Sequence, residues 1–232
     1  MKTRIIEVRQ QVLKQNDVTA RALRQRFQDA GVFVVSLVSS PGAGKTTFLE
    51  KTLTRLSDHC RVAALVGDLA TDNDARRLAN SGAPVRQITT GAICHLEASM
   101  VESALADWEL DRLDFLFIEN VGNLVCPASY DLGEALRLVL MSVTEGEDKP
   151  LKYPTIFNTA DLALITKIDL ADAVDFKREQ AYRSLHHVRP AMTTLEVSAK
   201  TGAGMENWLD LLKESRKSLI AAGSVGPRRG WA

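Results

Sequence analysis

The residues best suited to chemistry form a glycine-rich segment with a lysine and two threonines at its end. Residues 39–47 read Ser-Ser-Pro-Gly-Ala-Gly-Lys-Thr-Thr and follow a run of β-branched residues. Glycines let backbone N–H groups approach an anion closely, and a following helix adds the positive end of its dipole. In such a loop the lysine reaches the β- and γ-phosphates, and a threonine hydroxyl can ligate Mg²⁺. The segment therefore predicts a nucleoside triphosphate site. Its predicted phosphate-binding residues are Gly42, Ala43, Gly44, Lys45, Thr46 and Thr47.

The first position of this loop departs from the usual pattern, because Ser39 stands where a glycine is common. The departure concerns the first turn and leaves the Gly-Lys-Thr part intact. A plain strand-to-helix turn is the competing interpretation. It is disfavoured because a turn does not need lysine and two threonines behind its glycines.

A second motif predicts which purine the site selects. Thr166-Lys167-Ile168-Asp169 closes an expected strand. The Asp169 carboxylate can accept hydrogen bonds from guanine N1–H and from its exocyclic amine, whereas adenine offers no such pair of donors. A buried carboxylate left without donors costs a few kcal/mol, which provides the discrimination. The stem of Lys167 can cover the base. The common motif is Asn-Lys-x-Asp, so Thr166 removes an amide that often fixes this loop, and a lowered affinity is expected.

A third segment supports the guanine interpretation. Ser198, Ala199 and Lys200 follow the last expected strand, where a guanine-supporting loop belongs. Alone, the Thr-Lys-Ile-Asp segment is equally compatible with a solvated strand end. Together with the phosphate loop and Ser-Ala-Lys, it predicts a site for GTP and GDP.

Acidic residues at two other strand ends predict the magnesium and hydrolysis chemistry. Glu119-Asn120-Val121-Gly122 closes a strand, so that Glu119 can hold Mg²⁺ through a water and the Gly122 N–H can contact the γ-phosphate. Asp68 ends a parallel strand at the same edge of the sheet. Asp72 or Asp74 closes the metal shell, orients the attacking water or caps a helix, and these alternatives stay open. The predicted catalytic residues are Lys45, Asp68, Asp74 and Glu119. The predicted Mg²⁺ ligands are Thr46, Asp68 and Glu119. The sequence shows no evident glutamine or arginine finger, so slow intrinsic hydrolysis is expected.

Two cysteines and a histidine form a candidate metal site. Cys94-His95 precedes a helical pattern, and Cys126 follows the Glu119–Gly122 segment. Thiolates and imidazole are suitable ligands for Zn²⁺ or Ni²⁺, and three of them leave the shell open for water or a second subunit. Spacing alone is weak evidence, because free cysteines are commonly core residues. Cys60 is read as a core residue, and His186-His187 as a favourable helix end.

The elements that must position these residues alternate along the chain. The expected strands are 33–38, 61–67, 85–89, 115–118, 136–143, 162–166 and 194–197. The expected helices are 4–30 with a break at Asn16-Asp17, 45–56, 74–80, 95–108, 176–186 and 205–220. Alternation of this kind implies right-handed crossovers. We therefore expect an α/β, three-layer P-loop NTPase fold, with a mostly parallel sheet and helices on both faces. The expected domains are an N-terminal helical extension (1–30), a GTPase domain (31–222) and a flexible tail (223–232).

Composition limits the partners and the compartment. Among 232 residues, 29 Lys and Arg balance 29 Asp and Glu, which disfavours a nucleic-acid protein held by bulk charge. No apolar run reaches the roughly 18 residues needed to span a bilayer, and the N-terminus lacks a signal-peptide pattern. Three cysteines are too few for a disulfide framework. We expect no nucleic acid, no membrane and a cytoplasmic location.

Two longer motifs resemble a known family. Residues 119–127 read Glu-Asn-Val-Gly-Asn-Leu-Val-Cys-Pro, and residues 143–154 read Val-Thr-Glu-Gly-Glu-Asp-Lys-Pro-Leu-Lys-Tyr-Pro. With Gly67-Asp68, Thr90-Gly91 and Cys94-His95-Leu96, they resemble the HypB family of hydrogenase nickel-incorporation GTPases, in the SIMIBI class of P-loop GTPases. The related urease GTPases carry a different pattern after the strand and fit worse.

The resemblance implies several properties. GTP promotes a dimer, and Cys94, His95 and Cys126 match the family's Zn²⁺ or Ni²⁺ site at the dimer interface. Lys149 and Lys152 either reach the partner's nucleotide or are ordinary surface lysines. The implied partners are the nickel chaperone HypA and the large subunit of [NiFe]-hydrogenase. Some members store nickel on N-terminal cysteines or histidines. Because residues 1–31 contain neither, storage is not expected.

The expected function is therefore that of a GTP-hydrolysing metallochaperone that helps insert nickel into [NiFe]-hydrogenase. The alternative is a regulatory P-loop GTPase in which the cysteines are structural and no metal is delivered. A small-metabolite P-loop kinase is a third interpretation. It is disfavoured because a kinase needs no residues that recognise guanine.

Overall fold

The computed structural model describes residues 2–68 and 73–222. Its strands form one sheet in the order β3-β2-β4-β1-β5-β6-β7, with neighbouring strands parallel. The strands are β1 (Phe33–Ser39), β2 (Val62–Asp68), β3 (Val85–Thr89), β4 (Phe115–Glu119), β5 (Leu136–Ser142), β6 (Leu162–Thr166) and β7 (Thr193–Val197). Every residue of β1, β4 and β6 is buried, as expected for parallel strands covered on both faces.

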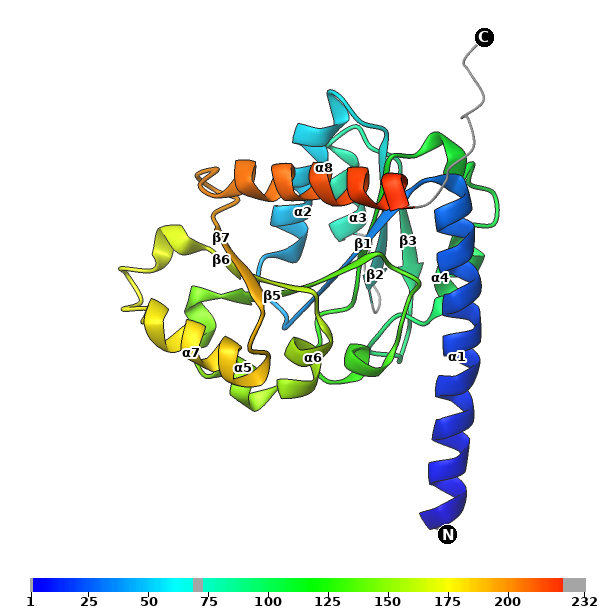
Figure 1. Ribbon diagram of the computed structural model, residues 1–232, viewed down its shortest axis with the longest axis horizontal. Helices are drawn as coiled ribbons and strands as arrows, with labels where there is room; N and C mark the ends of the chain where they lie inside the picture. Colours follow the sequence, from blue (N-terminus) through cyan, green and yellow to red (C-terminus); the bar gives the residue numbers. More distant parts are fainter. Residues whose placement is uncertain (1, 69–72, 223–232) are drawn as a thin grey trace.

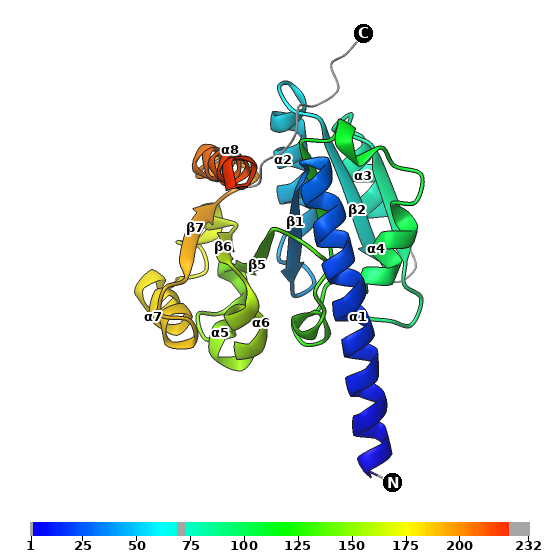
Figure 2. The same cartoon turned by 45° about the vertical axis from the view of Figure 1, so that its right-hand side comes forward.

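Helices cover both faces of this sheet (Figures 1 and 2). The helices are α1 (Lys2–Ala30), α2 (Lys45–Ser57), α3 (Asn73–Ala79), α4 (Ala98–Ala104), α5 (Lys149–Lys152), α6 (Pro154–Thr159), α7 (Arg178–Val188) and α8 (Met205–Ala222). On one face, α2 and α8 meet the sheet in a core that contains Phe48 and Trp208. On the other face, α1 and α4 cover one half of the sheet and α6 and α7 the other half. The predicted three-layer α/β fold is confirmed.

Helix α1 differs from the sequence prediction, because it runs without a break through Asn16 and Asp17. Asn16 is 6% exposed and uses its amide in two tertiary contacts. Its Nδ2 donates to the Asp131 carbonyl at 2.8 Å, and its Oδ1 accepts from the Ala98 N–H at 2.9 Å. An asparagine whose side chain is bonded elsewhere does not compete for its own helix backbone, which explains why the predicted break is wrong.

The predicted helix 95–108 is also wrong in extent, since α4 covers Ala98–Ala104 only. Side chains from other elements accept hydrogen bonds from two N–H groups ahead of and at its start, and so hold this part of the chain in its observed course. The Leu96 N–H donates to Asn120 Oδ1 at 3.0 Å, and the Ala98 N–H donates to Asn16. Residues 94–96 therefore form a loop. Two short helices, α5 and α6, were not predicted, and prolines lie in their first turns.

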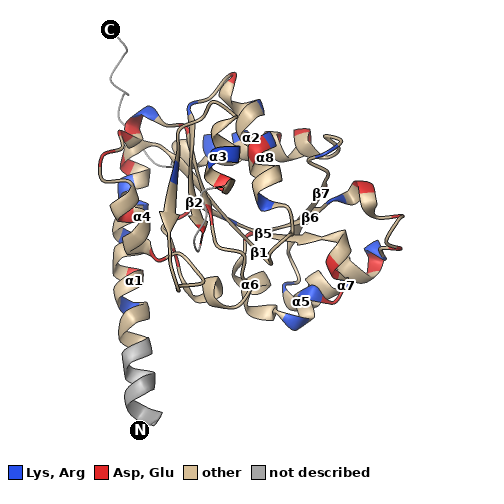
Figure 3. Cartoon of the chain, turned by 180° about the vertical axis from the view of Figure 1, so that it is seen from behind, with Lys and Arg blue, Asp and Glu red and all other residues tan. Residues whose placement is uncertain are grey.

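Charged residues of both signs are interspersed over the helices (Figure 3). Among the described residues, no helix has the length and apolar character needed to span a bilayer. The predicted tail, 223–232, and Asp72 lie outside the described residues.

Candidate nucleotide site and metal cluster

The glycine-rich segment forms a tight loop between β1 and α2, as the sequence predicted. Gly42 and Gly44 have φ values of +77° and +94°, a conformation that favours glycine. Lys45 is buried, and its Nζ donates to Ser39 Oγ at 3.0 Å. The serine that replaces the usual first glycine therefore holds the lysine over the loop. Burial lowers the pKa of Lys45, while Glu119, Asp74 and Glu145 oppose that shift.

A carboxylate and a hydroxyl meet at the start of α2. Thr46 Oγ1 donates to Glu119 Oε1 at 2.7 Å. The other oxygen, Glu119 Oε2, is buried and has no hydrogen-bond partner. Burial raises the pKa of Glu119 to about 7, although Lys45 and Thr46 oppose the shift. A buried carboxylate oxygen without a partner, beside a threonine hydroxyl, is a donor set that fits Mg²⁺.

These residues line a cavity of about 520 Å³. Asp68 and Asp74 also line it, and so does Gly122, where an added Cβ would lie 3.1 Å from the backbone of Pro41. Asp74 lies within the first turn of α3, inside the helix and not at its cap. The sequence analysis missed Arg77, one turn further along α3. Arg77 lines the same cavity and pairs with Glu50 at 2.8 Å.

A second cavity, of about 230 Å³, lies beside the first. Its lining includes Lys167, Asp169, Ala199 and Lys200 from the two predicted guanine segments. The two cavities share Gly44, Thr47 and Lys167, so they form one continuous site.

Hydrogen bonds from three elements shape the base cavity. Asp169 Oδ1 accepts from Ser198 Oγ at 2.6 Å, which orients the carboxylate. Lys167 reaches back to the glycine-rich loop, where its Nζ donates to the Gly42 carbonyl at 2.7 Å. Thr166 Oγ1 donates to the Ala43 carbonyl at 2.7 Å, so the threonine fixes the loop by a different bond from the expected amide.

Glu145 makes a further contact with the glycine-rich loop, which the sequence did not predict. Its carboxylate accepts a hydrogen bond from Ser40 of the glycine-rich loop and from the Ser142 N–H. Lys149, from the segment implied to reach a partner's nucleotide, lies 3.2 Å from the same carboxylate. The contact joins residues far apart in the chain, and no local pattern signals it.

Cys94, His95 and Cys126 form a compact cluster, with their ligand atoms within 4.8 Å of one another. The two sulfur atoms are 2.9 Å apart. Both ring nitrogens of His95 are buried without a hydrogen-bond partner, and the nearest carboxylate, Glu97, is 3.6 Å from Nε2. A buried imidazole without partners beside two thiols fits a soft divalent metal. Burial lowers the pKa of His95, which favours the neutral ring that metals require.

The cluster is tied to the nucleotide site through one strand end. Asn120, which directly follows Glu119, accepts hydrogen bonds from the Leu96 and Val121 N–H groups. Asn123 Nδ2 donates to the Cys94 carbonyl at 3.2 Å. The loop of Cys94 and His95 is therefore bonded to the segment that lies between Glu119 and Cys126.

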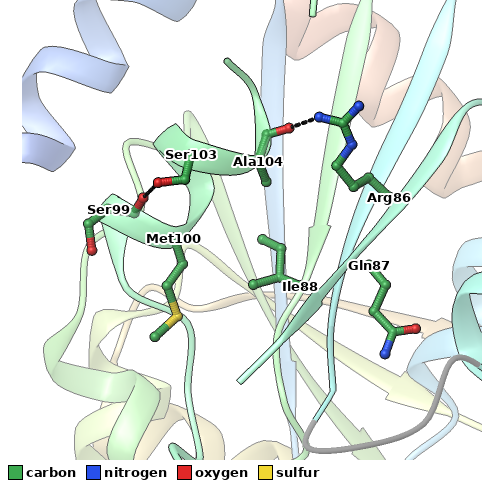
Figure 4. A pocket seen from close by; sticks show the side chains of 7 residues that line it. All are labelled: Arg86, Gln87, Ile88, Ser99, Met100, Ser103 and Ala104. Atoms are coloured by element: carbon green, nitrogen blue, oxygen red, sulfur yellow. Dashed lines mark hydrogen bonds between the residues drawn. The ribbon is translucent and has the colours of Figure 1, made fainter. Parts of the chain in front are cut away.

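A hollow of about 490 Å³ at the β3 edge is a separate feature (Figure 4). It lies between β3 and α4. The guanidinium of Arg86 donates to the Ala104 carbonyl and pairs with Asp107, so this cation is already bound. None of the predicted site residues lines this hollow.

The fold and the continuous pair of cavities define a P-loop nucleotide-binding protein. A family model described as the CobW/HypB/UreG nucleotide-binding domain matches residues 33–196. The chain belongs to this family, and to the HypB proteins within it, as the following relatives show.

The hydrogenase maturation factor HypB of Azotobacter chroococcum is 46% identical over 95% of this chain and 72% of its own length. That of Escherichia coli strain K12 is 46% identical over 92% of this chain and 73% of its own. HypB of Helicobacter pylori in complex with nickel has a TM-score of 0.83 at 40% identity, over 94% of this chain and 100% of the other. HypB of Archaeoglobus fulgidus has a TM-score of 0.81 at 37% identity, over 88% of this chain and 99% of the other. The resemblance predicted from motifs is confirmed.

Proposed function

We propose that this chain is a GTP-hydrolysing metallochaperone that helps insert nickel into [NiFe]-hydrogenase. One observation carries the proposal: a cluster of two thiols and an unpartnered imidazole is bonded to the segment that follows Glu119. A similar structure is described as a complex with nickel, which supports nickel as the metal. The relatives are named hydrogenase maturation factors, which supports hydrogenase as the protein that receives it.

The nucleotide half of the function rests on the two joined cavities. Asp169 accepts the guanine N1–H and amine, and Lys167 covers the base. Backbone N–H groups of residues 42–47 and the Lys45 ammonium bind the phosphates. Ser198, Ala199 and Lys200 support the base from the opposite loop.

Hydrolysis is assigned to the polar end of the larger cavity. Thr46, Glu119 and Asp68 would hold Mg²⁺, which offsets charge on the β- and γ-phosphates. Asp74 faces the same space, and Asp68 or Asp74 orients the attacking water. The Gly122 N–H donates to the γ-phosphate, so the segment from Glu119 to Cys126 has different contacts before and after phosphate release.

Coupling to metal follows from this segment. When Gly122 gains or loses the γ-phosphate, Asn120 and Asn123 transmit the displacement to Cys94, and Cys126 lies on the segment itself. The chain forms a GTP-dependent homodimer across the cluster, receives or exchanges nickel with HypA and delivers it to the hydrogenase large subunit in the cytoplasm. Zn²⁺ is the competing occupant of the cluster.

The decisive experiment measures metal stoichiometry in two nucleotide states. Wild type, Cys94→Ala and Cys126→Ala are titrated with Ni²⁺ and with Zn²⁺, in GDP and in a GTP analogue. We expect metal binding by wild type, its loss in both variants, and a dependence on nucleotide. Cys60→Ala is the matched control and binds metal like wild type. Unchanged binding in both cluster variants would instead support a regulatory GTPase without metal delivery.

A further inference from the structure

The side chain of Asn16 in α1 joins the two segments that carry the metal ligands. Figures 1 and 2 show α1 lying beside α4 at one end of the sheet. The Asn16 amide donates to the Asp131 carbonyl and accepts from the Ala98 N–H. This residue is buried, whereas its neighbours Gln15 and Asp17 on the same turn are exposed.

On the first segment, Asn16 fixes the loop of Cys94 and His95. Ala98 begins α4, three residues after His95, and its N–H has Asn16 as acceptor. His95 itself has no hydrogen bond from either ring nitrogen. The position of its ring therefore depends on the backbone around it, on contact with Tyr130 and on the Glu97 carboxylate 3.6 Å from Nε2.

On the second segment, Asn16 fixes the loop after Cys126. The ring of Tyr130 packs on His95 with centroids 3.9 Å apart, and Asp131 follows it directly. α1 holds Asp131 a second time, since Arg24 donates to both carboxylate oxygens at 2.7 and 2.8 Å. The loop from Cys126 to Asp131 is thus docked on the same helix as the loop of His95.

We propose that Asn16 is a positioning residue for the Cys94–His95–Cys126 metal site, and that through it α1 sets the spacing of the two ligand-bearing loops. The inference rests on the proposed metal function. One planar amide satisfies an N–H and a carbonyl at once, so removing it frees both loops together and takes this partner from a buried N–H and a partly buried carbonyl. Outer partners that orient metal ligands typically change metal affinity by about 10- to 100-fold when removed.

The test compares Asn16→Ala with Gln15→Ala, an exposed residue on the same turn. The 232-residue chain loaded with GDP is titrated anaerobically with Ni²⁺, and binding is followed by thiolate-to-nickel charge-transfer absorption. We expect Asn16→Ala to weaken Ni²⁺ binding about tenfold and to alter the absorption bands. Its affinity for GDP stays within about twofold of wild type. Gln15→Ala behaves like wild type.

Amide hydrogen exchange supplies a second readout, which a general loss of stability would not reproduce. In metal-free Asn16→Ala, exchange rises in peptides covering 93–98 and 126–131, while the glycine-rich loop keeps its protection. Asn16→Asp keeps the acceptor for Ala98 and removes the donor to Asp131, so faster exchange is confined to 126–131.

Three outcomes overturn the inference. If a folded Asn16→Ala variant binds Ni²⁺ with wild-type affinity, the inference about Asn16 is wrong and the proposed function stands. Equal losses of Ni²⁺ and GDP affinity, with faster exchange throughout, show a structural role and also overturn it. Absence of metal binding in wild type overturns the proposed function itself, and the inference falls with it.

Discussion

At the residue scale, the proposed role of Asp169, whose carboxylate accepts from Ser198, is base selection. Asp169→Asn replaces an acceptor oxygen with an amide donor that faces the two donors of guanine. Losing a hydrogen bond to a charged group costs about 1.5–3 kcal/mol, so we expect GTP affinity to fall by about 10- to 150-fold. Xanthine carries an acceptor oxygen in place of the amine, so XTP binding improves. Competition with a fluorescent GDP analogue measures both effects.

Asp172→Asn provides the matched control for this prediction. Asp172 is exposed and lies three residues further along the chain. It should leave GTP and XTP affinities unchanged. Equal affinity for GTP and ATP in the wild-type protein would contradict the assignment of Asp169 as the guanine-binding residue.

Thr166 allows a separate test of how the glycine-rich loop is fixed. Thr166→Val keeps the shape but removes the hydroxyl that donates to Ala43. An unpaired buried carbonyl costs about 1–3 kcal/mol, so we predict about fivefold or greater loss of GDP affinity by calorimetry. Thr166→Ser retains the hydroxyl and should remain within about twofold of wild type. If the Thr166→Val variant binds GDP as tightly as wild type does, the hydrogen bond from Thr166 to the Ala43 carbonyl does not support the loop.

The two cluster sulfurs also predict selective oxidation. They are 2.9 Å apart, whereas tetrahedral zinc thiolates with bonds of about 2.3 Å lie about 3.8 Å apart. In metal-free protein, diamide should therefore oxidise Cys94 and Cys126 together to a disulfide, and bound Ni²⁺ or Zn²⁺ should prevent it. Mass spectrometry after alkylation counts the remaining thiols. Cys60 is the internal control, and its oxidation before the pair would count against this prediction.

At the element scale, the docking of α1 predicts a pH dependence of stability. Burial raises the pKa of Asp131, but Arg24 and the Gly133 N–H outweigh it and hold that pKa below its usual value. A depressed folded-state pKa adds stability above the unfolded value, near 3.9, and that stability is lost as pH falls through the folded value. Because this ion pair is partly exposed, we predict that Asp131→Asn costs about 1 kcal/mol at pH 7.

Urea unfolding at pH 7 and at pH 3 checks this prediction. The difference between Asp131→Asn and wild type should shrink at the lower pH, because below an unfolded pKa of about 3.9 the unfolded wild-type carboxyl takes up a proton more readily than the folded one. Asp17→Asn, an exposed change on the same helix, should show little difference at either pH. A gap that widens on acidification would contradict the proposed sign.

The elements themselves were predicted where the signal is local. Continuous apolar runs identified the strands, and glycine followed by lysine marked the turn into α2. Asn16 shows why α1 was predicted incorrectly: asparagine breaks a helix when its amide competes for the backbone, and here tertiary partners occupy the amide. Residues 94–96 also depend on a tertiary partner, because Asn120, far along the chain, accepts from the Leu96 N–H and holds this segment in place ahead of α4.

The candidate site divides along the same line. Lys45 and Asp169 belong to short motifs whose chemistry is visible in sequence, whereas spacing was weak evidence for the metal cluster, which was assigned through the family resemblance. The contacts of Glu145 with Ser40, and of Asn16 with Asp131, join residues about 100 positions apart. Such pairings depend on how the strands are ordered in the sheet, which no single segment encodes.

At the scale of the whole molecule, strand order explains why the motifs converge. β4 and β5 flank β1, and β2 and β6 lie one strand further out. The carboxyl ends of these parallel strands meet at one edge of the sheet, where ligands bind in open α/β folds. Ser39, Asp68, Glu119 and Thr166 are the last residues of β1, β2, β4 and β6. The residues predicted to bind phosphate, metal and base therefore lie at one edge.

The surface around the metal cluster predicts where a second copy binds. Ile93 and Val125 each precede a cluster cysteine and are 37% and 64% exposed, an apolar rim that a dimer would cover. Val125→Asp would place a charge in that contact. Light scattering should show a dimer of wild type with a GTP analogue and a monomer of the variant, while GDP affinity stays within about twofold. Val18→Asp, at a 52% exposed position on α1, is the control that still dimerises. If the Val125→Asp variant dimerises as strongly as wild type, the interface lies elsewhere. The metal cluster would then be open to solvent in both nucleotide states.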